Sequence, residues 1–480
     1  MPSSSLKTEN KGDFGESDIT NEYFYDQRGN LIKEIQSNGF GKLYSYNESG
    51  LIKNIEYFDE DTLELETEYS YDSQGRIIRM SDYKTNDDEE IVPYRHTIYG
   101  YDLWGRSAWI SELDTEKEYS ELTDSDINKN KIQYTYDLSD RICKIDYPST
   151  ISGEIKAIKY FYNESGQKSK IIAVTKDNKE NLLHSYKYDK FGNVSEINEY
   201  ADFTKDSSTM ITRRYIYDDI NRISQMTYQK GNDVLNSISY CYDKNSNVTK
   251  KSEVNISMKN KKVDETITYK YDSLGQLIRS DKKNNETNTE EVNTYTYDDV
   301  GNRIASTING ESSIYYYNGL DQLTRKVTMN EDAKTSLEVY TYDKSGNEIA
   351  STDMLTGMST ESKYDPAGRL KERIISNGNS ETFVQRNLYN GNNKRIKKED
   401  NGVCQYYHYE GDILSYVSDE ENHVDIKFLH DSDEVIASED LKKQETYLYN
   451  RDDQGSVKDL LNQDGNSVTS YRYGDYGEKM

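Results

Sequence analysis

The chain has 480 residues, a formal net charge of −27 at pH 7, 33% hydrophobic residues and a mean hydropathy of −1.00. This acidic balance argues against a nucleic-acid partner, because binding to a phosphate backbone depends on clustered Lys and Arg. Low hydrophobicity with high charge is typical of disordered chains. The 45 Tyr argue for an ordered fold instead, because they recur in pairs and each can bury roughly 150–250 Å².

Residues 1–20 precede the first Tyr pair and lack the basic start and apolar core of a signal peptide. We expect a disordered or atypical segment here. The absence of a signal peptide fits a cytoplasmic protein, and it fits an interior piece of a longer chain equally well. No run of about 18 apolar residues occurs, so no membrane span is expected. Cys143, Cys241 and Cys404 are far apart and odd in number, which predicts neither a disulfide framework nor a metal cluster.

From residue 21 to 445 the chain repeats one pattern: Tyr-x-Tyr-Asp, a Gly three residues after the Asp, then a short apolar run. Self-similarity at a period of roughly 20–50 residues indicates a stacked repeat architecture. The residue after the second Tyr is Asp in eleven copies and Asn in five, the exceptions being Glu410 and Gly474. Residues 428–431 are a degenerate copy. Two further copies lie in residues 446–480. In chain order, the second Tyr of the eighteen copies is Tyr25, Tyr46, Tyr71, Tyr101, Tyr136, Tyr162, Tyr188, Tyr217, Tyr242, Tyr271, Tyr297, Tyr317, Tyr342, Tyr364, Tyr389, Tyr409, Tyr449 and Tyr473.

Each copy is expected to be a β-hairpin. Aromatic residues two apart favour one face of a strand, and Asp at the first and Gly at the fourth position are typical of a type I turn. We interpret the signature residues as structural: Tyr pairs stack and Asp and Gly make the turn. In five clear copies they are Tyr69, Tyr71, Asp72 and Gly75; Tyr186, Tyr188, Asp189 and Gly192; Tyr269, Tyr271, Asp272 and Gly275; Tyr295, Tyr297, Asp298 and Gly301; Tyr340, Tyr342, Asp343 and Gly346.

A lone hairpin is marginally stable in water, so the predicted fold is all-β, with antiparallel hairpins stacked edge to edge into a curved, spiralling sheet. Eighteen hairpins give about 36 strands, and at about 4.8 Å per strand the strip measures roughly 170 Å. Such a strip is expected to curl about once round a cavity without sealing it. The polar insertions 114–130 and 204–212 are expected to be exposed loops, and no long stretch has helical periodicity.

No catalytic, cofactor or metal site is predicted. Cys404 and His408 share a strand face by their spacing, which we interpret as strand packing and not as a nucleophile pair. His430 and Asp431, with Asp433 and Glu434, are interpreted as the degenerate repeat. The acidic runs 59–61, 87–90 and 431–434 lack the spacing that fixes calcium ligands and are interpreted as solvated loops.

The signature resembles the YD repeats, also called RHS repeats, and stands in full at residues 69–76, 99–106, 186–193, 295–302 and 340–347. Residues 446–480 are similar to the opening of the RHS-repeat-associated core. The resemblance implies a hollow β-shell like those of insecticidal Tc toxins, bacterial polymorphic RHS toxins and teneurins; in the toxins the shell holds a C-terminal effector, which core aspartates release by self-proteolysis. The sequence stops before the part of the core that is expected to carry the cleavage site. Asp365 to Arg369 resembles a core motif but stands in register with the repeats, so we interpret it as an ordinary turn.

The leading hypothesis is a non-enzymatic segment of a shell around a C-terminal toxin, with that toxin domain or the remaining shell segments as partners. The location would then be exported or at the cell surface, and otherwise cytoplasmic. Two alternatives stay open. The Tyr-rich sheet could bind cell-surface carbohydrate or a protein partner by stacking, or the chain could be an orphan fragment without an effector.

Overall fold

The computed structural model describes residues 5–10, 19–151, 153–205, 209–256, 262–330, 334–378, 380–432 and 434–478. These residues form 38 strands in one sheet. Each strand pairs antiparallel with the next one along the chain, from β1 with β2 to β37 with β38. The predicted all-β sheet of stacked hairpins is confirmed.

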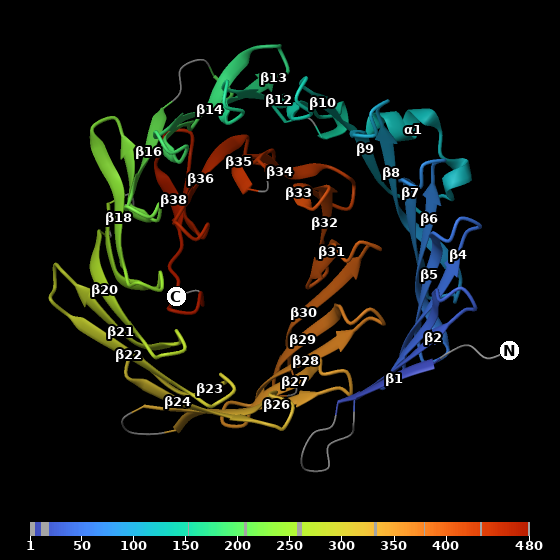
Figure 1. Ribbon diagram of the computed structural model, residues 1–480. Helices are drawn as coiled ribbons and strands as arrows, with labels where there is room; N and C mark the ends of the chain where they lie inside the picture. The colour runs from blue at the N-terminus through green and yellow to red at the C-terminus, as the bar shows by residue number, and fades with distance from the viewer. Residues whose placement is uncertain are drawn as a thin grey trace.

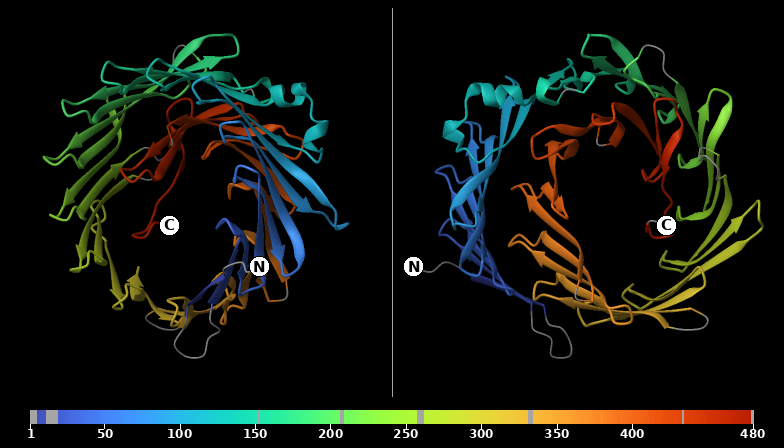
Figure 2. Two further views of the ribbon diagram at one scale, coloured as in Figure 1. Left: turned by 45° about the vertical axis from the view of Figure 1, so that its right-hand side comes forward. Right: turned by 180° about the vertical axis from the view of Figure 1, so that it is seen from behind.

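The sheet is an open spiral whose last third lies inside its first two thirds (Figures 1 and 2). We call β1–β25 the outer coil and β26–β38 the inner coil. Hydrogen bonds join the two coils at both ends of their overlap. The bonded residues Ser37 and Lys344 are 307 residues apart in the sequence, whereas Tyr295 and Asp475 are only 180 apart. The separation falls because the inner coil needs fewer residues than the outer coil to cover the same arc. The strip therefore winds further than the single circuit expected from its length, and it overlaps itself. Among the described residues β1 pairs only with β2 and β38 only with β37, so the sheet does not close into a barrel.

The outer coil holds two thirds of the strands. Their bounds are β1 (Ser5–Asn10), β2 (Ile19–Tyr25), β3 (Leu31–Gln36), β4 (Phe40–Tyr46), β5 (Ile52–Asp59), β6 (Thr62–Tyr71), β7 (Ile77–Thr85), β8 (Ile91–Tyr101), β9 (Ser107–Asp114), β10 (Lys131–Tyr136), β11 (Ile142–Asp146), β12 (Ile155–Tyr162), β13 (Lys168–Thr175), β14 (Glu180–Tyr188), β15 (Val194–Tyr200), β16 (Met210–Tyr217), β17 (Ile223–Lys230), β18 (Asp233–Tyr242), β19 (Val248–Asn255), β20 (Val263–Tyr271), β21 (Leu277–Asn284), β22 (Glu290–Tyr297), β23 (Arg303–Ile308), β24 (Glu311–Tyr317) and β25 (Leu323–Met329).

The inner coil continues the same strip to the chain end. Its strands are β26 (Lys334–Tyr342), β27 (Glu348–Asp353), β28 (Met358–Tyr364), β29 (Leu370–Asn377), β30 (Ser380–Tyr389), β31 (Arg395–Asp400), β32 (Val403–Glu410), β33 (Ile413–Ser418), β34 (Val424–Asp431), β35 (Glu434–Asp440), β36 (Glu445–Arg451), β37 (Val457–Leu461) and β38 (Ser467–Ser470).

The insertions differ in part from the loops expected. Residues 114–130 contain η1 (Tyr119–Glu121) and the short helix α1 (Asp124–Lys129), which begins at a capping box between Thr123 and Asp126. In the insertion 204–212, residues 206–208 lie outside the described residues and β16 begins at Met210. In the described residues no helix has the length and apolar character needed to cross a membrane.

The predicted divisions at residues 20 and 445 do not interrupt the sheet. Residues 5–10 form β1 against β2, and the rest of 1–18 lies outside the described residues. β36 spans the second division and pairs with β35 and β37.

The core lies between the two coils. Its fully buried residues from the outer coil include Ile155, Ile171 and Phe203, and those from the inner coil include Leu429 and Ala437, each with 0% exposure. Burial is thus supplied by aliphatic residues of facing coils as well as by Tyr, which explains how a chain with so low a mean hydropathy is ordered.

Candidate functional site

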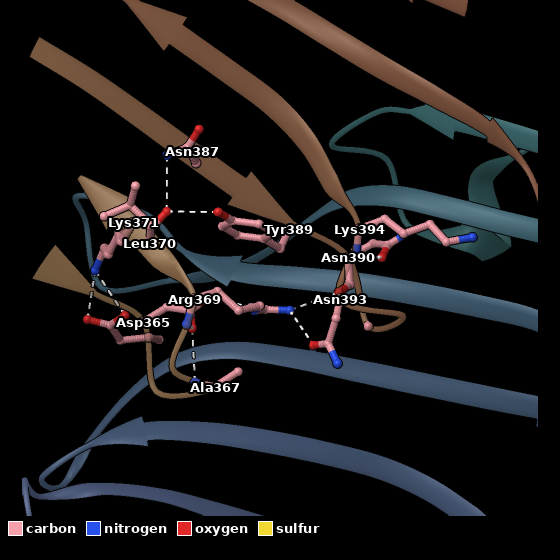
Figure 3. Close-up of polar contacts among 12 residues, drawn as sticks. Asp365, Ala367, Arg369, Leu370, Lys371, Asn387, Tyr389, Asn390, Asn393 and Lys394 are labelled. Carbon is pink, nitrogen blue, oxygen red and sulfur yellow. Dashed lines mark hydrogen bonds and ion pairs between the residues drawn. The ribbon is translucent and has the colours of Figure 1, made fainter. Parts of the chain in front are cut away.

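One repeat turn shows how the signature residues act (Figure 3). At the end of β28, Oδ1 of Asp365 accepts hydrogen bonds from the backbone N–H groups of Ala367 and Arg369, both at 3.0 Å. The N–H of Gly368 donates to the carbonyl oxygen of Asp365 at 2.8 Å, and the φ of Gly368 is +78°, a conformation that glycine adopts without strain. The segment from Asp365 to Arg369 is therefore an ordinary repeat turn.

The same geometry recurs in the five clear copies. Burial alone would raise the pKa of Asp72, but hydrogen bonds from the backbone and side chain of Arg76 outweigh it and lower that pKa, so the carboxylate stays ionised. The turn carboxylates that bind the backbone N–H groups two and four residues ahead are Asp72, Asp189, Asp272, Asp298 and Asp343. The glycines with φ between 80° and 98° are Gly75, Gly192, Gly275, Gly301 and Gly346.

The second Tyr of each copy joins neighbouring repeats. The hydroxyl of Tyr71 donates to the carbonyl oxygen of Ile52, in the preceding repeat, at 2.7 Å. A return strand separates the Tyr strands of successive repeats. Tyr pairs of successive repeats therefore do not stand on adjacent strands, and the second Tyr joins the repeats through its hydroxyl on a backbone carbonyl. The second Tyr of each of the other four clear copies donates to a backbone carbonyl oxygen in the same way: Tyr188 to Lys168, Tyr271 to Val248, Tyr297 to Leu277 and Tyr342 to Leu323.

The first Tyr of several copies reaches carboxylates. Tyr186 donates to Oδ2 of Asp431 at 2.5 Å and Tyr295 to Oδ2 of Asp475 at 2.7 Å, both on the inner coil. Tyr340 donates to Oε2 of Glu338 within its own strand at 2.5 Å. Burial raises the pKa of all three hydroxyls, as it does for Tyr69 and Tyr269. The first Tyr therefore contributes to the contact between coils in two of these copies.

Charged groups are also buried between the coils. Arg95 of β8 is 0% exposed; its guanidinium binds Asp114 at 2.6 Å and donates to the carbonyl oxygen of Tyr407, on β32, at 2.9 Å. Burial would raise the pKa of Asp114, but the charge of Arg95 outweighs it and lowers that pKa. Lys458 of the inner coil pairs with Glu253 of the outer coil at 3.2 Å. We call this surface between the coils, with its apolar core, the seam.

The Teneurin YD-shell family model matches residues 196–480, which is more than half of the chain. The chain belongs to the teneurin YD-shell family. Its place in the YD-shell family gives it a structural role as part of a β-shell.

The curated relatives and the solved structures match the chain only in part or at low identity. The tRNA nuclease WapA of Bacillus subtilis (strain 168) and the tRNA3(Ser)-specific nuclease WapA of Bacillus spizizenii are each 29% identical over 146 residues, which is 30% of this chain and 5% of the relative. The chain thus matches about a twentieth of the length of these curated relatives. Two similar solved structures are a Photorhabdus luminescens Tc holotoxin pore and TcdB2-TccC3; each is 13% identical over 96% of this chain with a TM-score of 0.28, covering 30% and 31% of the solved chain.

Cys404 and His408, which share a strand face, each contact other residues of the YD-shell wall. His408 of β32 contacts the hydroxyl of Ser418 at 3.1 Å and lies 3.5 Å from Oδ2 of Asp114, across the seam. Cys404 contacts Oε2 of Glu399 at 3.8 Å. Asp433 lies outside the described residues. Within the described ranges, no three His, Cys, Asp or Glu side chains are placed to hold a metal ion.

Sequence reasoning missed two sets of contacts in the YD shell. In three turns the residue after the turn Gly is Arg, and its guanidinium lies over the second Tyr of the next repeat. Arg76 lies 4.3 Å from the ring centre of Tyr101, Arg106 4.3 Å from that of Tyr136, and Arg369 5.0 Å from that of Tyr389. The Gly-Arg dipeptide of the signature is the feature of the sequence from which these contacts could have been predicted. The seam residues Arg95 and Asp82 had no such signal, because their partners on the inner coil lie about three hundred residues away.

Proposed function

We propose that the chain forms part of the wall of a hollow shell that encloses a C-terminal toxin domain, and that it performs no chemistry itself. The observation that carries the proposal is the double wall: two coils of one sheet are joined by a buried seam around a central region that no described strand crosses (Figure 1). A wall of this kind separates what it surrounds from solvent and proteases.

Apolar turn tips along the outer coil support the existence of further shell segments. Large apolar side chains stand at the second or third position of six repeat turns and are strongly exposed. In the inner coil the equivalent Ala367 packs against a buried cluster of Tyr57, Leu65, Tyr94 and Ile396, the first three of which belong to the outer coil. A turn tip can therefore dock on another layer of YD sheet. The exposed tips, with their exposures, are Leu103 98%, Trp104 77%, Leu138 106%, Phe191 68%, Ile220 63%, Leu274 77% and Val300 72%.

The carbohydrate hypothesis has less support. Sugar rings bind by stacking on accessible aromatic faces. Where side-chain burial is described, Tyr316 at 39% and Tyr476 at 48% are the Tyr residues more than a third exposed. Most Tyr rings are covered by the neighbouring repeat or by the facing coil.

Protease protection of a fused cargo tests the proposal. In one fusion an unfolded reporter peptide is attached to the C-terminus of the chain. In the control fusion the same peptide is attached to the N-terminus of the same chain. Enclosure predicts that the C-terminal peptide is cleaved at least about tenfold more slowly than the N-terminal one, because the cleavage rate depends on the fraction of molecules in which the peptide is accessible to the protease. Equal cleavage of the two peptides would contradict enclosure.

A further inference from the structure

A cavity of about 470 Å³ lies in the seam, between the outer coil and the hairpin β32–β33. Its outer wall is formed by side chains of β8 to β13, and its inner wall by the hairpin and by the end of β34. Most of the lining is apolar or aromatic. The lining residues that matter here are Tyr99, Ile110, Tyr134, Ile145 and Tyr160 from the outer coil, and Glu410, Ile413 and His430 from the inner coil.

The cavity exists because the repeat turn is shortened at this point. Glu410 pairs directly with Ile413, so only Gly411 and Asp412 connect β32 to β33. An ordinary turn carries a third residue at its tip, as Ala367 does where it packs on the outer coil. Here Gly411 has no side chain, and the side chain of Asp412 is 100% exposed. Nothing from the tip therefore fills the space beneath the hairpin.

Glu410 stands where most copies have the turn Asp or Asn, and its side chain lines the cavity. Its Oε1 accepts a hydrogen bond from the hydroxyl of Ser415 at 2.6 Å. Burial raises the pKa of Glu410 to about 7. Among the described residues no cation is within ion-pair distance of this carboxylate. The charged and titratable groups around it are Lys427, Glu112, Tyr134, Tyr147, Tyr160 and Tyr416, with His430, Arg141 and Lys168 also in the wall. Burial lowers the pKa of His430 to about 4.

The two cations of the wall are already paired. Arg141 binds Asp137 at 2.6 Å and lies over the ring of Tyr162. Lys168 binds Asp431 and donates to the hydroxyl of Ser432. Lys427, the nearby cation behind the wall, pairs with Glu439 at 3.5 Å. Glu410 is therefore a lining carboxylate with no counter-charge within ion-pair distance among the described residues, and it lies beside the rings of Tyr134 and Tyr160.

We propose that this cavity is a binding site for a small organic ammonium ion with a hydrocarbon body. The cation would lie against Glu410 and the Tyr faces, since aromatic faces attract cations. The hydrocarbon body would lie against Ile110, Ile145 and Ile413. A sugar fits less well, because its several hydroxyls need convergent polar partners and this lining is mainly apolar. The inference does not depend on the shell enclosing a toxin.

Calorimetric titration with three probes of one size tests the proposal on the full chain. The probes are benzylammonium, benzyl alcohol and benzoate, which carry positive, zero and negative charge. At about pH 8, above the pKa of Glu410, benzylammonium is expected to bind at least about tenfold more tightly than benzyl alcohol, and benzoate weakest. Equal affinities, tightest binding of benzoate, or no binding of any probe would overturn the proposal.

Two variants locate the effect at Glu410. Glu410→Gln is expected to weaken benzylammonium about tenfold while leaving benzyl alcohol unchanged, which also shows that the cavity has kept its shape. Asp412→Asn, in the same hairpin but fully exposed, is the matched control and should leave both affinities unchanged. If Glu410→Gln binds the ammonium probe as the native chain does, the site is not the one proposed.

Lowering the pH gives a third readout. Protonation of Glu410 removes the counter-charge, so benzylammonium is expected to bind more weakly as the pH falls from about 8 to about 6, through the pKa of this group. Benzyl alcohol should show no such dependence. A pH dependence of equal size for the two probes would contradict a role for the carboxylate.

Discussion

The repeat turns of the outer and inner coils share one backbone but differ in the residues at their tips. The turn at Asp72 and the turn at Asp365 make the same hydrogen bonds, from the backbone N–H groups two and four residues ahead. The outer coil ends several of its turns in large exposed side chains such as Trp104. In the inner coil, Ala367 and Gly391 are small residues at two turns that meet the outer coil, and a Cβ on Gly391 would lie 2.4 Å from Cγ2 of Thr67. The turn itself is therefore determined locally, whereas its tip is determined by the surface that it meets.

The largest effect is expected from the buried charge at the seam. Arg95→Met leaves Asp114 and Glu112 buried beside an uncharged side chain and should lower the free energy of unfolding by about 3–5 kcal/mol. Arg386 also lies between two carboxylates, Glu372 and Glu399, but is 56% exposed, so Arg386→Met should cost about 1 kcal/mol or less. Urea denaturation measures the free energy of unfolding of both variants. Equal decreases would show that a charge buried in the seam contributes no more to stability than an exposed one.

The pH dependence of stability is expected to come from the same surface. Asp82 is 0% exposed, and its Oδ1 accepts hydrogen bonds from Thr67 and from the N–H of Gly391. Burial raises its pKa from 3.8 to about 7, so the folded state binds the proton more tightly than the unfolded state does. This contribution is fully present below the unfolded pKa and is lost as the pH rises through about 7.

Asp82→Asn isolates that contribution. The native chain is expected to lose about 2–3 kcal/mol of unfolding free energy between about pH 4 and pH 7 because of this group, and the variant should lose correspondingly less. Denaturation curves at several pH values measure the difference. The expectation is wrong if the two proteins show parallel pH profiles.

The close approach of the coils at Gly391 is expected to have the next largest effect. Gly391→Leu forces a side chain into Thr67 and the hydroxyl of Tyr69 and should cost about 1–3 kcal/mol. Gly319 follows Asn318 as Gly391 follows Asn390, but it lies in an exposed outer turn. Gly319→Leu is thus the matched control, and thermal melting should show little change for it. Similar losses at both sites would mean that the backbone and not the seam excludes larger residues.

The smallest effect is expected within a single repeat junction. Tyr271→Phe removes the hydrogen bond from the hydroxyl to the carbonyl oxygen of Val248, at 2.9 Å, and should cost about 1 kcal/mol. Hydrogen exchange of the amides in β19 and β20 should rise while exchange at the seam stays the same. A global change in exchange would show that this junction is coupled to the whole spiral.

The sequence predicted what depends on neighbours in the chain. Asp72 and Gly75 specify a turn within four residues, and the Tyr pairs mark the strands, so the hairpins and their order could be read directly. The overlap of the coils could not, because contacts such as Asp82 with Gly391 join residues 309 apart and leave no periodic pattern. The short helix α1 was missed although Thr123 and Asp126 form a readable capping box. The sequence showed that Glu410 breaks the Asp or Asn pattern of the turns. It did not show that a cavity lies beside this residue.

Zero-length carbodiimide cross-linking with mass spectrometry tests the two-coil spiral most directly. Lys371 of the inner coil lies 2.8 Å from a carboxylate oxygen of Glu64 on the outer coil, and both are accessible. The spiral predicts a covalent link between the peptides that contain these two residues, at protein concentrations where links between molecules are absent. If links form only between strands adjacent in the chain, the sheet does not wind over itself and the double wall is wrong.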